Sequence, residues 1–343
     1  MKGNFFLGNG RFEVREMHFG EPAAHEVFIR NMAAGICGTD VHIYHGHKGS
    51  AEVTPPVVLG HEYSGVVEAV GSEVTSVRPG DCVTVDPNIY CGRCRYCRNG
   101  QKQFCEHLFA VGVNRDGGFA EYSMVPESQV FRMNPEVGFA AMAMAEPLAC
   151  CVHGIGLSGI RAGDTVCVVG GGAIGLLMVQ LALLRGAAQV ILSEPVAARR
   201  SVALSLGACA AVDPAAGNVR EQLADAAGRA DGADVVIECV GRTVAARQAI
   251  DLCAPGGRVL LFSVPEPGAE LALPLFDVYK KELTISGSFI NPDSHLQAVN
   301  LINSGRIRTD LLITHTYPLA ALEDAINMQM STDSIKVQLL PQT

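Results

Sequence analysis

The pattern of hydrophobic and polar positions changes character near residue 150. Residues 1 to about 147 contain short apolar runs, such as 55–71 (PPVVLGHEYSGVVEAVG) and 81–86 (DCVTVD), which glycine and proline repeatedly interrupt. Runs of this kind are typical of β-strands joined by turns. The first part of the chain is therefore predicted to be an irregular, mostly β domain.

From about 160 to 288 the pattern instead alternates between short apolar strands and helical segments. The strands are expected at 165–170 (TVCVVG), 188–194 (AQVILSE), 234–241 (DVVIECVG) and 258–264 (RVLLFSV), with helices at 173–186 and 243–253 between them. This alternation predicts an α/β domain with a doubly wound parallel sheet. From about 289 the elements are mixed again, so residues 1–147 and 289–343 are expected to form one domain and 148–288 the other.

Composition narrows the class of protein. The chain has 343 residues, 48% of them hydrophobic and 18% charged, which is enough for two domains with large cores. A net charge of -9 argues against nucleic acid or an anionic membrane as partner. We find no leader pattern and expect no apolar run of about 18 residues, so the expected location is cytoplasmic. In a reducing compartment, twelve cysteines imply core residues, metal ligands or reactive thiols rather than disulfides.

One polar segment concentrates four of these cysteines. They are Cys91, Cys94, Cys97 and Cys105, in the spacing C-x2-C-x2-C-x7-C. Four thiolates with such spacing favour a closed structural zinc site. The main alternative is an iron-sulfur cluster, but bacterial ferredoxin spacing ends C-x3-C-P, whereas Glu106 follows the last cysteine here. A role as core thiols fits poorly with the arginine-rich surroundings.

A second, dispersed set offers a different ligand mixture. Cys37 lies in GICGTDVH, His61 and Glu62 in LGHEYSG, and Glu146 in AEPLACCVHG. Each residue alone is more readily explained by core packing than by metal binding. Together they supply the thiolate, imidazole and carboxylate ligands of a catalytic zinc that keeps one position open, and Asp40 is a candidate to orient the His61 ring.

A third signal follows the strand expected at 165–170. The pattern G-x-G-x-x-G is met by Gly170, Gly172 and Gly175. It opens a predicted helix, and Glu194 stands at the end of the next strand, which is the context of a dinucleotide-binding fingerprint. The glycines would admit a pyrophosphate to the helix N-terminus. The Glu194 carboxylate favours NAD over NADP, although Arg199 and Arg200 offer a possible partner for a 2′-phosphate.

These motifs together resemble one enzyme family. The segments GHEYSGVVEAVGSEV, the four-cysteine lobe, DGGFAEY, EPLACCVHG and GGGAIG occur in the order and at the spacing of the zinc-dependent medium-chain dehydrogenases. The chain is most similar to the branch that contains sorbitol, arabinitol, galactitol-phosphate and threonine dehydrogenases. The resemblance implies a GroES-like catalytic domain carrying two zinc ions, a Rossmann NAD-binding domain, and a homodimer or homotetramer.

The resemblance also implies roles for individual residues. Metal ligation falls to Cys37, His61 and Glu62, while Glu146 either ligates the metal or holds its water. Coenzyme contacts fall to Ile174, Glu194 and Arg199, and a proton relay to Thr39 and His42. The implied reaction is hydride transfer from a secondary hydroxyl to NAD.

The substrate expectation rests on what the candidate pocket segments lack. Ile290 follows Phe289 where sorbitol dehydrogenases commonly carry arginine, and Arg115 is the one basic residue in the segments 43–44, 109–119 and 289–291. An anionic substrate normally needs a basic partner. We therefore expect a neutral polyol of five or six carbons, a size taken from the resemblance.

Polar candidates for hydrogen bonding to the substrate hydroxyls are Tyr44, Asn114 and Asn291. Polyol-phosphate and threonine dehydrogenases remain alternatives. So does a non-catalytic zinc- or nucleotide-binding relative, but such relatives usually lack the zinc ligands that are present here. A metal-storage or redox-sensing protein would leave the nucleotide fingerprint unexplained.

Overall fold

The computed structural model describes residues 1–47 and 52–343, which divide into two units. The terminal unit combines Met1–Ala149 with Asn291–Thr343, and the central unit is Cys150–Ile290. The sequence had placed the two boundaries after residues 147 and 288. The chain therefore leaves the terminal unit, forms the central unit, and returns to complete the first.

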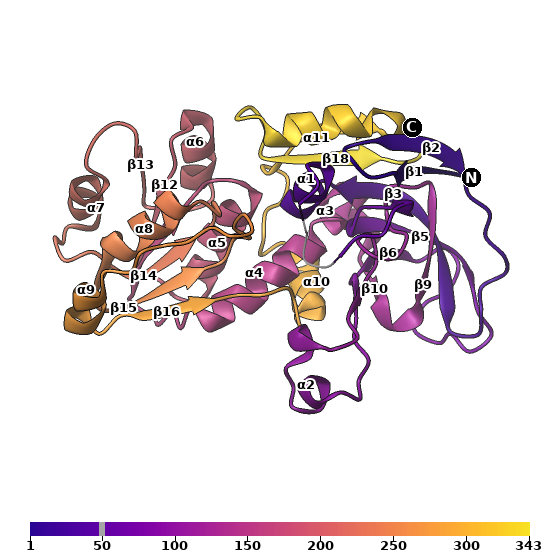
Figure 1. Ribbon diagram of the computed structural model, residues 1–343, viewed down its shortest axis with the longest axis horizontal. Helices are drawn as coiled ribbons and strands as arrows, with labels where there is room; N and C mark the ends of the chain where they lie inside the picture. The colour runs from indigo at the N-terminus through magenta and orange to yellow at the C-terminus, as the bar shows by residue number, and fades with distance from the viewer. Residues whose placement is uncertain (48–51) are drawn as a thin grey trace. The chain divides into compact units, whose positions relative to one another are not determined.

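The main sheet of the terminal unit joins strands from both ends of the chain (Figure 1). Its strand order is β10 (Val130–Arg132), β6 (Cys82–Val85), β5 (Glu62–Val70), β3 (Glu26–Gly35), β18 (Lys336–Leu340) and β17 (Ile313–Pro318), and β9 (Tyr122–Pro126) also pairs with β3. β3 is antiparallel to both β5 and β18, with Gly35 opposite Glu62 on one side and Gln338 on the other. The last strand of the chain thus lies beside a strand from its first tenth.

Smaller elements complete the terminal unit. They are the strands β1 (Lys2–Phe6), β2 (Phe12–Glu16), β4 (Val57–Val58), β7 (Asn88–Ile89) and β8 (Phe109–Ala110), the helices α1 (Gly38–Tyr44), α2 (Arg95–Arg98), α3 (Phe139–Met142), α10 (His295–Asn303) and α11 (Leu322–Met330), and the 3-10 turns η1 (Lys102–Phe104), η2 (Glu127–Gln129), η3 (Pro135–Val137) and η4 (Leu319–Ala321). Its core includes Ile29, Leu59, Tyr63 and Phe119, all fully buried.

One apolar segment is longer than the sequence led us to expect. Phe139–Leu157 covers α3 and α4 (Ala145–Leu157), and its 19 residues, with a hydropathy of 1.4, are long and apolar enough to cross a membrane. However, 67% of that apolar window is buried inside the protein. Core packing therefore accounts for its composition.

The central unit is built on a six-stranded sheet in which every pairing is parallel (Figure 1). The order is β13 (Ala210–Val212), β12 (Gln189–Ser193), β11 (Thr165–Val169), β14 (Ala233–Glu238), β15 (Cys253–Leu261) and β16 (Thr284–Gly287). The helices are α5 (Ala173–Leu184), α6 (Ala197–Ser205), α7 (Val219–Ala227), α8 (Thr243–Leu252) and α9 (Leu275–Lys281). The expected parallel α/β fold is confirmed, and the full burial of β11 is typical of a strand covered on both faces.

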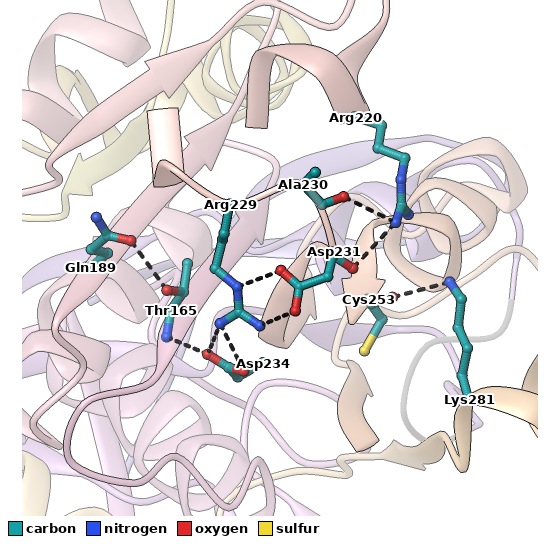
Figure 2. Close-up of polar contacts among 9 residues, drawn as sticks. All are labelled: Thr165, Gln189, Arg220, Arg229, Ala230, Asp231, Asp234, Cys253 and Lys281. Carbon is teal, nitrogen blue, oxygen red and sulfur yellow. Dashed lines mark hydrogen bonds and ion pairs between the residues drawn. The ribbon is translucent and has the colours of Figure 1, made fainter. Parts of the chain in front are cut away.

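A polar network ties together the amino ends of two central strands (Figure 2). The Arg229 guanidinium donates to both Asp231 and Asp234, at 2.6 to 3.0 Å. Asp234, in β14, also accepts from the backbone N–H of Thr165 at the start of β11, at 2.8 Å. This network holds the strands together at the amino edge of the sheet. The glycine-rich loop follows the end of β11 and therefore lies at the opposite, carboxyl edge.

Candidate functional site

The four-cysteine lobe brings its sulfur atoms together. The ligand atoms of Cys91, Cys94, Cys97 and Cys105 all lie within 4.8 Å of one another. Backbone N–H groups already point at the sulfurs, for example Cys94 N to Cys91 Sγ and Cys91 N to Cys105 Sγ, both at 3.3 Å. Donors from the Cys97 and Glu106 backbone lower the pKa of Cys94 to about 6. Burial raises the pKa of Cys97 to about 12, so the thiols do not all favour the thiolate form in the absence of a metal. The geometry carries the argument, because four sulfur atoms at short mutual distances fit a tetrahedral zinc ion.

A second cluster lies where α1 and β5 begin. Cys37 is the N-cap residue of α1, and His61 and Glu62 stand at the start of β5. One ligand atom from each lies within 4.8 Å of the other two. His61 and Glu62 are 7% and 2% exposed, so a cation bound here would be largely shielded from water.

Asp40 supports this cluster from within α1. Its Oδ2 accepts from the backbone N–H of Cys37 at 2.8 Å, and its Oδ1 lies 3.7 Å from His61 Nδ1. Among the described residues neither of these last two atoms has a hydrogen-bond partner. Burial raises the pKa of Asp40 to about 6. Burial alone would lower the pKa of His61, but the Cys37 and Asp40 charges outweigh it and raise that pKa. A thiol, a ring and carboxylates buried this closely are a donor set suited to a divalent cation.

Three further predicted residues lie near this cluster. Glu146 is 6% exposed near the start of α4, and its charge helps to raise the pKa of His61, although it lies outside the three-residue group. Thr39 and His42 lie one turn apart on α1, both half-buried. The His42 ring is 6.0 Å from that of His47, which is exposed.

The glycine-rich loop of the central unit connects β11 to α5. Gly170 has a φ of +101°, and a side chain there would lie 3.0 Å from the Cys239 carbonyl. Gly172 is the N-cap residue of α5, Ile174 lies in its first turn, and a side chain at Gly175 would collide with the Gly170 carbonyl. Gly170 and Gly175 are therefore the two positions at which this tight turn requires glycine, whereas a side chain at Gly172 would meet no atom within 4 Å.

Glu194 ends the strand next to this loop and is 3% exposed. Its Oε2 accepts from Gly171 N at 2.6 Å and its Oε1 from Val196 N at 2.8 Å. Arg200 donates to the Glu194 and Pro195 carbonyls and pairs with Asp213 at 3.0 Å. The Glu194 side chain is thus held between the glycine-rich loop and its own segment, and the Arg200 side chain between that segment and Asp213, which follows β13. Arg199 lies in α6, half-buried.

The sequence matches two family models, one described as "Alcohol dehydrogenase GroES-like domain" over residues 23–135 and one as "Zinc-binding dehydrogenase" over residues 173–304. An L-threonine 3-dehydrogenase of Caldanaerobacter subterraneus subsp. tengcongensis is 36% identical over 321 residues, covering 92% of this chain and 91% of the relative. The chain belongs to the zinc-dependent medium-chain dehydrogenases.

Two further similar proteins match this dehydrogenase over almost its whole length. A sorbitol dehydrogenase of Halalkalibacterium halodurans is 35% identical, with 97% of both chains covered. A crystal structure of a zinc-binding dehydrogenase from Sinorhizobium meliloti 1021, bound to NADP, is 43% identical with a TM-score of 0.94, and the alignment covers 99% of each chain. The sequence-based identification of the family and of an oxidoreductase is confirmed.

One residue beside the cluster of Cys37, His61 and Glu62 was not predicted from the sequence of this dehydrogenase. Lys336, in β18, is 4% exposed; its Nζ donates to the Ile36 carbonyl at 2.9 Å and forms an ion pair with Glu62. No local motif marks this lysine, because only the pairing of β18 with β3 brings it close to Glu62.

A glycine contact behind His61 was also missed. Gly60 has a φ of +93°, and side chains at Gly112 and Gly117 would collide with its carbonyl. Gly118 N donates to the same carbonyl at 2.7 Å. The loop containing DGGFAEY therefore packs on the residue that precedes His61. The glycine pair in that motif was the available signal.

Asn291 and Asn114 both form hydrogen bonds within the protein, Asn291 through both ends of its amide and Asn114 through its oxygen. Asn291 is fully buried; it accepts from Asn88 Nδ2 at 2.5 Å and donates to Asp86 at 3.3 Å. Asn114 Oδ1 accepts from the backbone N–H of Ala110 at 2.8 Å. Both amides thus hold the base of the four-cysteine lobe, and the assignment of Asn291 as an available hydroxyl reader was wrong.

Proposed function

We propose that this dehydrogenase oxidises a secondary hydroxyl of a small neutral polyol and transfers the hydride to NAD, forming a ketose or ketone. The observation that carries the proposal is the grouping of Cys37, His61 and Glu62 ligand atoms within 4.8 Å in a buried setting. This is the ligand chemistry of a catalytic rather than a structural zinc site.

The residues would divide the work as follows. Cys37, His61 and Glu62 would hold the catalytic metal, with Glu146 as a fourth ligand or as the group that holds its water. Zinc there would lower the pKa of a hydroxyl, and a nicotinamide coenzyme would supply the hydride acceptor. Asp40 would keep the His61 ring oriented.

Proton removal falls to α1. Thr39 and His42 are one helical turn apart, so their side chains lie on the same face of α1. We infer that Thr39 relays the proton: its hydroxyl accepts the substrate proton as it passes its own on, through the coenzyme ribose, toward His42. An imidazole is the side chain best suited to exchange that proton with water near neutral pH.

NAD is the coenzyme that Glu194 supports. A buried carboxylate fixed by Gly171 N and Val196 N beside the loop would repel a 2′-phosphate. Gly170, Gly172, Ile174, Gly175 and Arg199 are the other proposed contacts. The relative crystallised with NADP makes a direct comparison of the two coenzymes necessary.

The position of Arg115 supports the proposal of a neutral substrate, because this basic side chain has an acidic neighbour. This residue, the basic exception in the candidate pocket segments, lies 3.9 Å from Glu26. Among the similar proteins, one acts on sorbitol and another on L-threonine, so an amino alcohol is the second candidate. A threonine carboxylate would need a basic partner, which neutral polyols do not.

A substrate panel tests the proposal. NAD reduction is measured with neutral pentitols and hexitols, polyol phosphates, L-threonine and ethanol. We expect the highest kcat/KM for a neutral polyol and a much lower one for ethanol, because ethanol has no further hydroxyl group to pair with the remaining polar candidates, Tyr44 and Asn114. A higher kcat/KM for threonine or for a phosphorylated polyol would reject the substrate assignment while retaining the hydride chemistry.

We also propose that the enzyme is a homodimer or homotetramer and that it is cytoplasmic, as the family resemblance implies. Support for self-association comes from α9, where Leu275, Phe276 and Tyr279 are 74%, 70% and 80% exposed. α9 precedes β16, an edge strand of the central sheet. Exposed apolar groups beside an open strand edge are features of contact surfaces.

A further inference from the structure

Lys336 places a buried positive charge against a proposed metal ligand. The side chains of Lys336 and Glu62 are 5% and 2% exposed, and the ion pair is formed by Glu62 Oε2. Lys336 is held in place by a second contact, since its Nζ donates to the Ile36 carbonyl at 2.9 Å. Removing two charges from water is costly unless both are well paired, so this pair has a defined geometry to maintain.

The backbone leaves room for the pair at one glycine. Gly35, at the end of β3, lies opposite Glu62 of β5 on one side and opposite Gln338 of β18 on the other. A side chain at Gly35 would collide with Glu62 Oε2 and would lie 2.9 Å from Lys336 Cε. The three strands thus form a space that fits the carboxylate and the ammonium group together.

The cluster of Cys37, His61 and Glu62 is surrounded by acidic groups, which bears on the role of the Lys336–Glu62 pair. Asp40, Glu62 and Glu146 are all at least nine-tenths buried, and Cys37 contributes a thiol. If Glu62 were released from Lys336, the nearest strong attraction for both of its oxygens would be the metal. A carboxylate can bind a cation through one oxygen or through two. Binding through two would fill the position that a catalytic zinc site keeps open.

We propose that Lys336 is a positioning residue: by holding Glu62 Oε2 it limits Glu62 to one oxygen for the metal and so preserves the coordination position for the substrate hydroxyl. This inference rests on the proposed function, since it requires a metal at Cys37, His61 and Glu62.

The test uses the full-length zinc-loaded enzyme and the variant Lys336→Met. Transfer of the catalytic zinc to a colorimetric chelator is expected to slow, because a second carboxylate oxygen would then bind the metal. The value of kcat is expected to fall by roughly tenfold, the usual loss of activity when a group that orients a metal ligand is removed. In the enzyme with cobalt at this site, the visible d–d bands are expected to weaken, because their intensity falls as the coordination number rises above four.

A double-variant comparison isolates the route through Glu62. In a Glu62→Gln background, Lys336→Met should change neither the zinc transfer rate nor the cobalt spectrum, because the released carboxylate is absent. Lys102→Met is the matched control: Lys102 pairs with Asp293 at 2.6 Å on the surface and should leave both readings unchanged. If Lys336→Met does not fold, Lys336→Gln, which keeps a donor for the Ile36 carbonyl, repeats the measurement.

Two results would overturn the proposal. Zinc transfer that is unchanged or faster in the lysine variant would show that Lys336 does not restrain Glu62, and so would an equal effect in the Glu62→Gln background. A wild-type enzyme that holds only one zinc per chain would overturn the proposed catalytic site itself and, with it, this inference.

Discussion

A buried histidine sets a pH limit on stability at the residue scale. His295 begins α10, is 1% exposed, and contacts the Phe131 ring at 4.8 Å; among the described residues neither of its ring nitrogens has a partner. Burial lowers the pKa of His295 from 6.5 to about 3. The unfolded chain therefore binds a proton that the folded protein rejects, so stability is lost as pH falls below about 6.5.

We predict that His295→Leu stabilises the protein at pH 5 relative to pH 8, by on the order of 2 kcal/mol. The measurement is denaturant unfolding of wild type and variant at both pH values. His25→Leu, at an exposed histidine, is the control and should show no such pH-dependent difference. An equal effect of His295→Leu at both pH values would contradict the prediction, because it would mean that the pKa of His295 is not lowered in the folded protein.

A second prediction at the level of single residues concerns the coenzyme and Glu194. We predict that kcat/KM with NAD exceeds that with NADP by at least about tenfold, or 1.4 kcal/mol, because the Glu194 carboxylate repels the 2′-phosphate. Glu194→Gln preserves the size of the side chain but removes its charge, so it should narrow the ratio. Steady-state kinetics with both coenzymes check this; an NADP preference in the wild type would indicate that Arg199 or Arg200 dominates.

At the scale of elements, the two cysteine-containing clusters should respond differently to substitution. We predict two zinc ions per chain. Cys94→Ser should leave one and destabilise the lobe, because its interior has few apolar side chains beyond the cysteines, such as Tyr90, Tyr96 and Leu108. His61→Ala should abolish turnover in a folded protein.

Elemental analysis, limited proteolysis and an NAD-reduction assay on the purified variants distinguish these outcomes. Cys94→Ser protein is expected to be cleaved within residues 88–111, whereas His61→Ala protein is expected to resist cleavage as the wild type does. An exchange of the two phenotypes would reverse the structural and catalytic roles assigned here.

Some helices, strands and site residues could be predicted from the sequence, and others could not. The four inner strands of the central sheet were predictable because each carries its own apolar pattern, and the glycine loop follows β11 directly. The edge strands β13 and β16 were not predicted, because they are short and have less continuous apolar patterns. Lys336 was not, because its place depends on β18 pairing with β3 across most of the chain. Asn291 was misjudged for a related reason: a buried amide bonded to Asn88 is indistinguishable, by sequence, from one that faces a substrate.

At the scale of the whole molecule, the exposed side chains of α9 predict association. We expect the wild type to sediment as a dimer or tetramer at micromolar concentration. Phe276→Asp should shift it to smaller species, because a charge would be buried at the contact. Phe104→Asp, at an aromatic residue 48% exposed on the four-cysteine lobe, is the matched control. Sedimentation velocity measures all three, and a monomeric wild type would reject the contact surface.

The position of β18 at the end of the chain has a consequence for biosynthesis. Ile36 and Lys336, which meet in the fold, are 300 residues apart in the chain. At about 5 to 20 residues per second, a ribosome needs roughly 15 to 60 s to reach Lys336 after making Ile36. During that time Cys37, His61 and Glu62 have been synthesised, whereas Lys336, which is proposed to restrain Glu62, has not. A nascent chain that met zinc early would hold it without this restraint, so the order of translation sets when the enzyme can acquire its finished site.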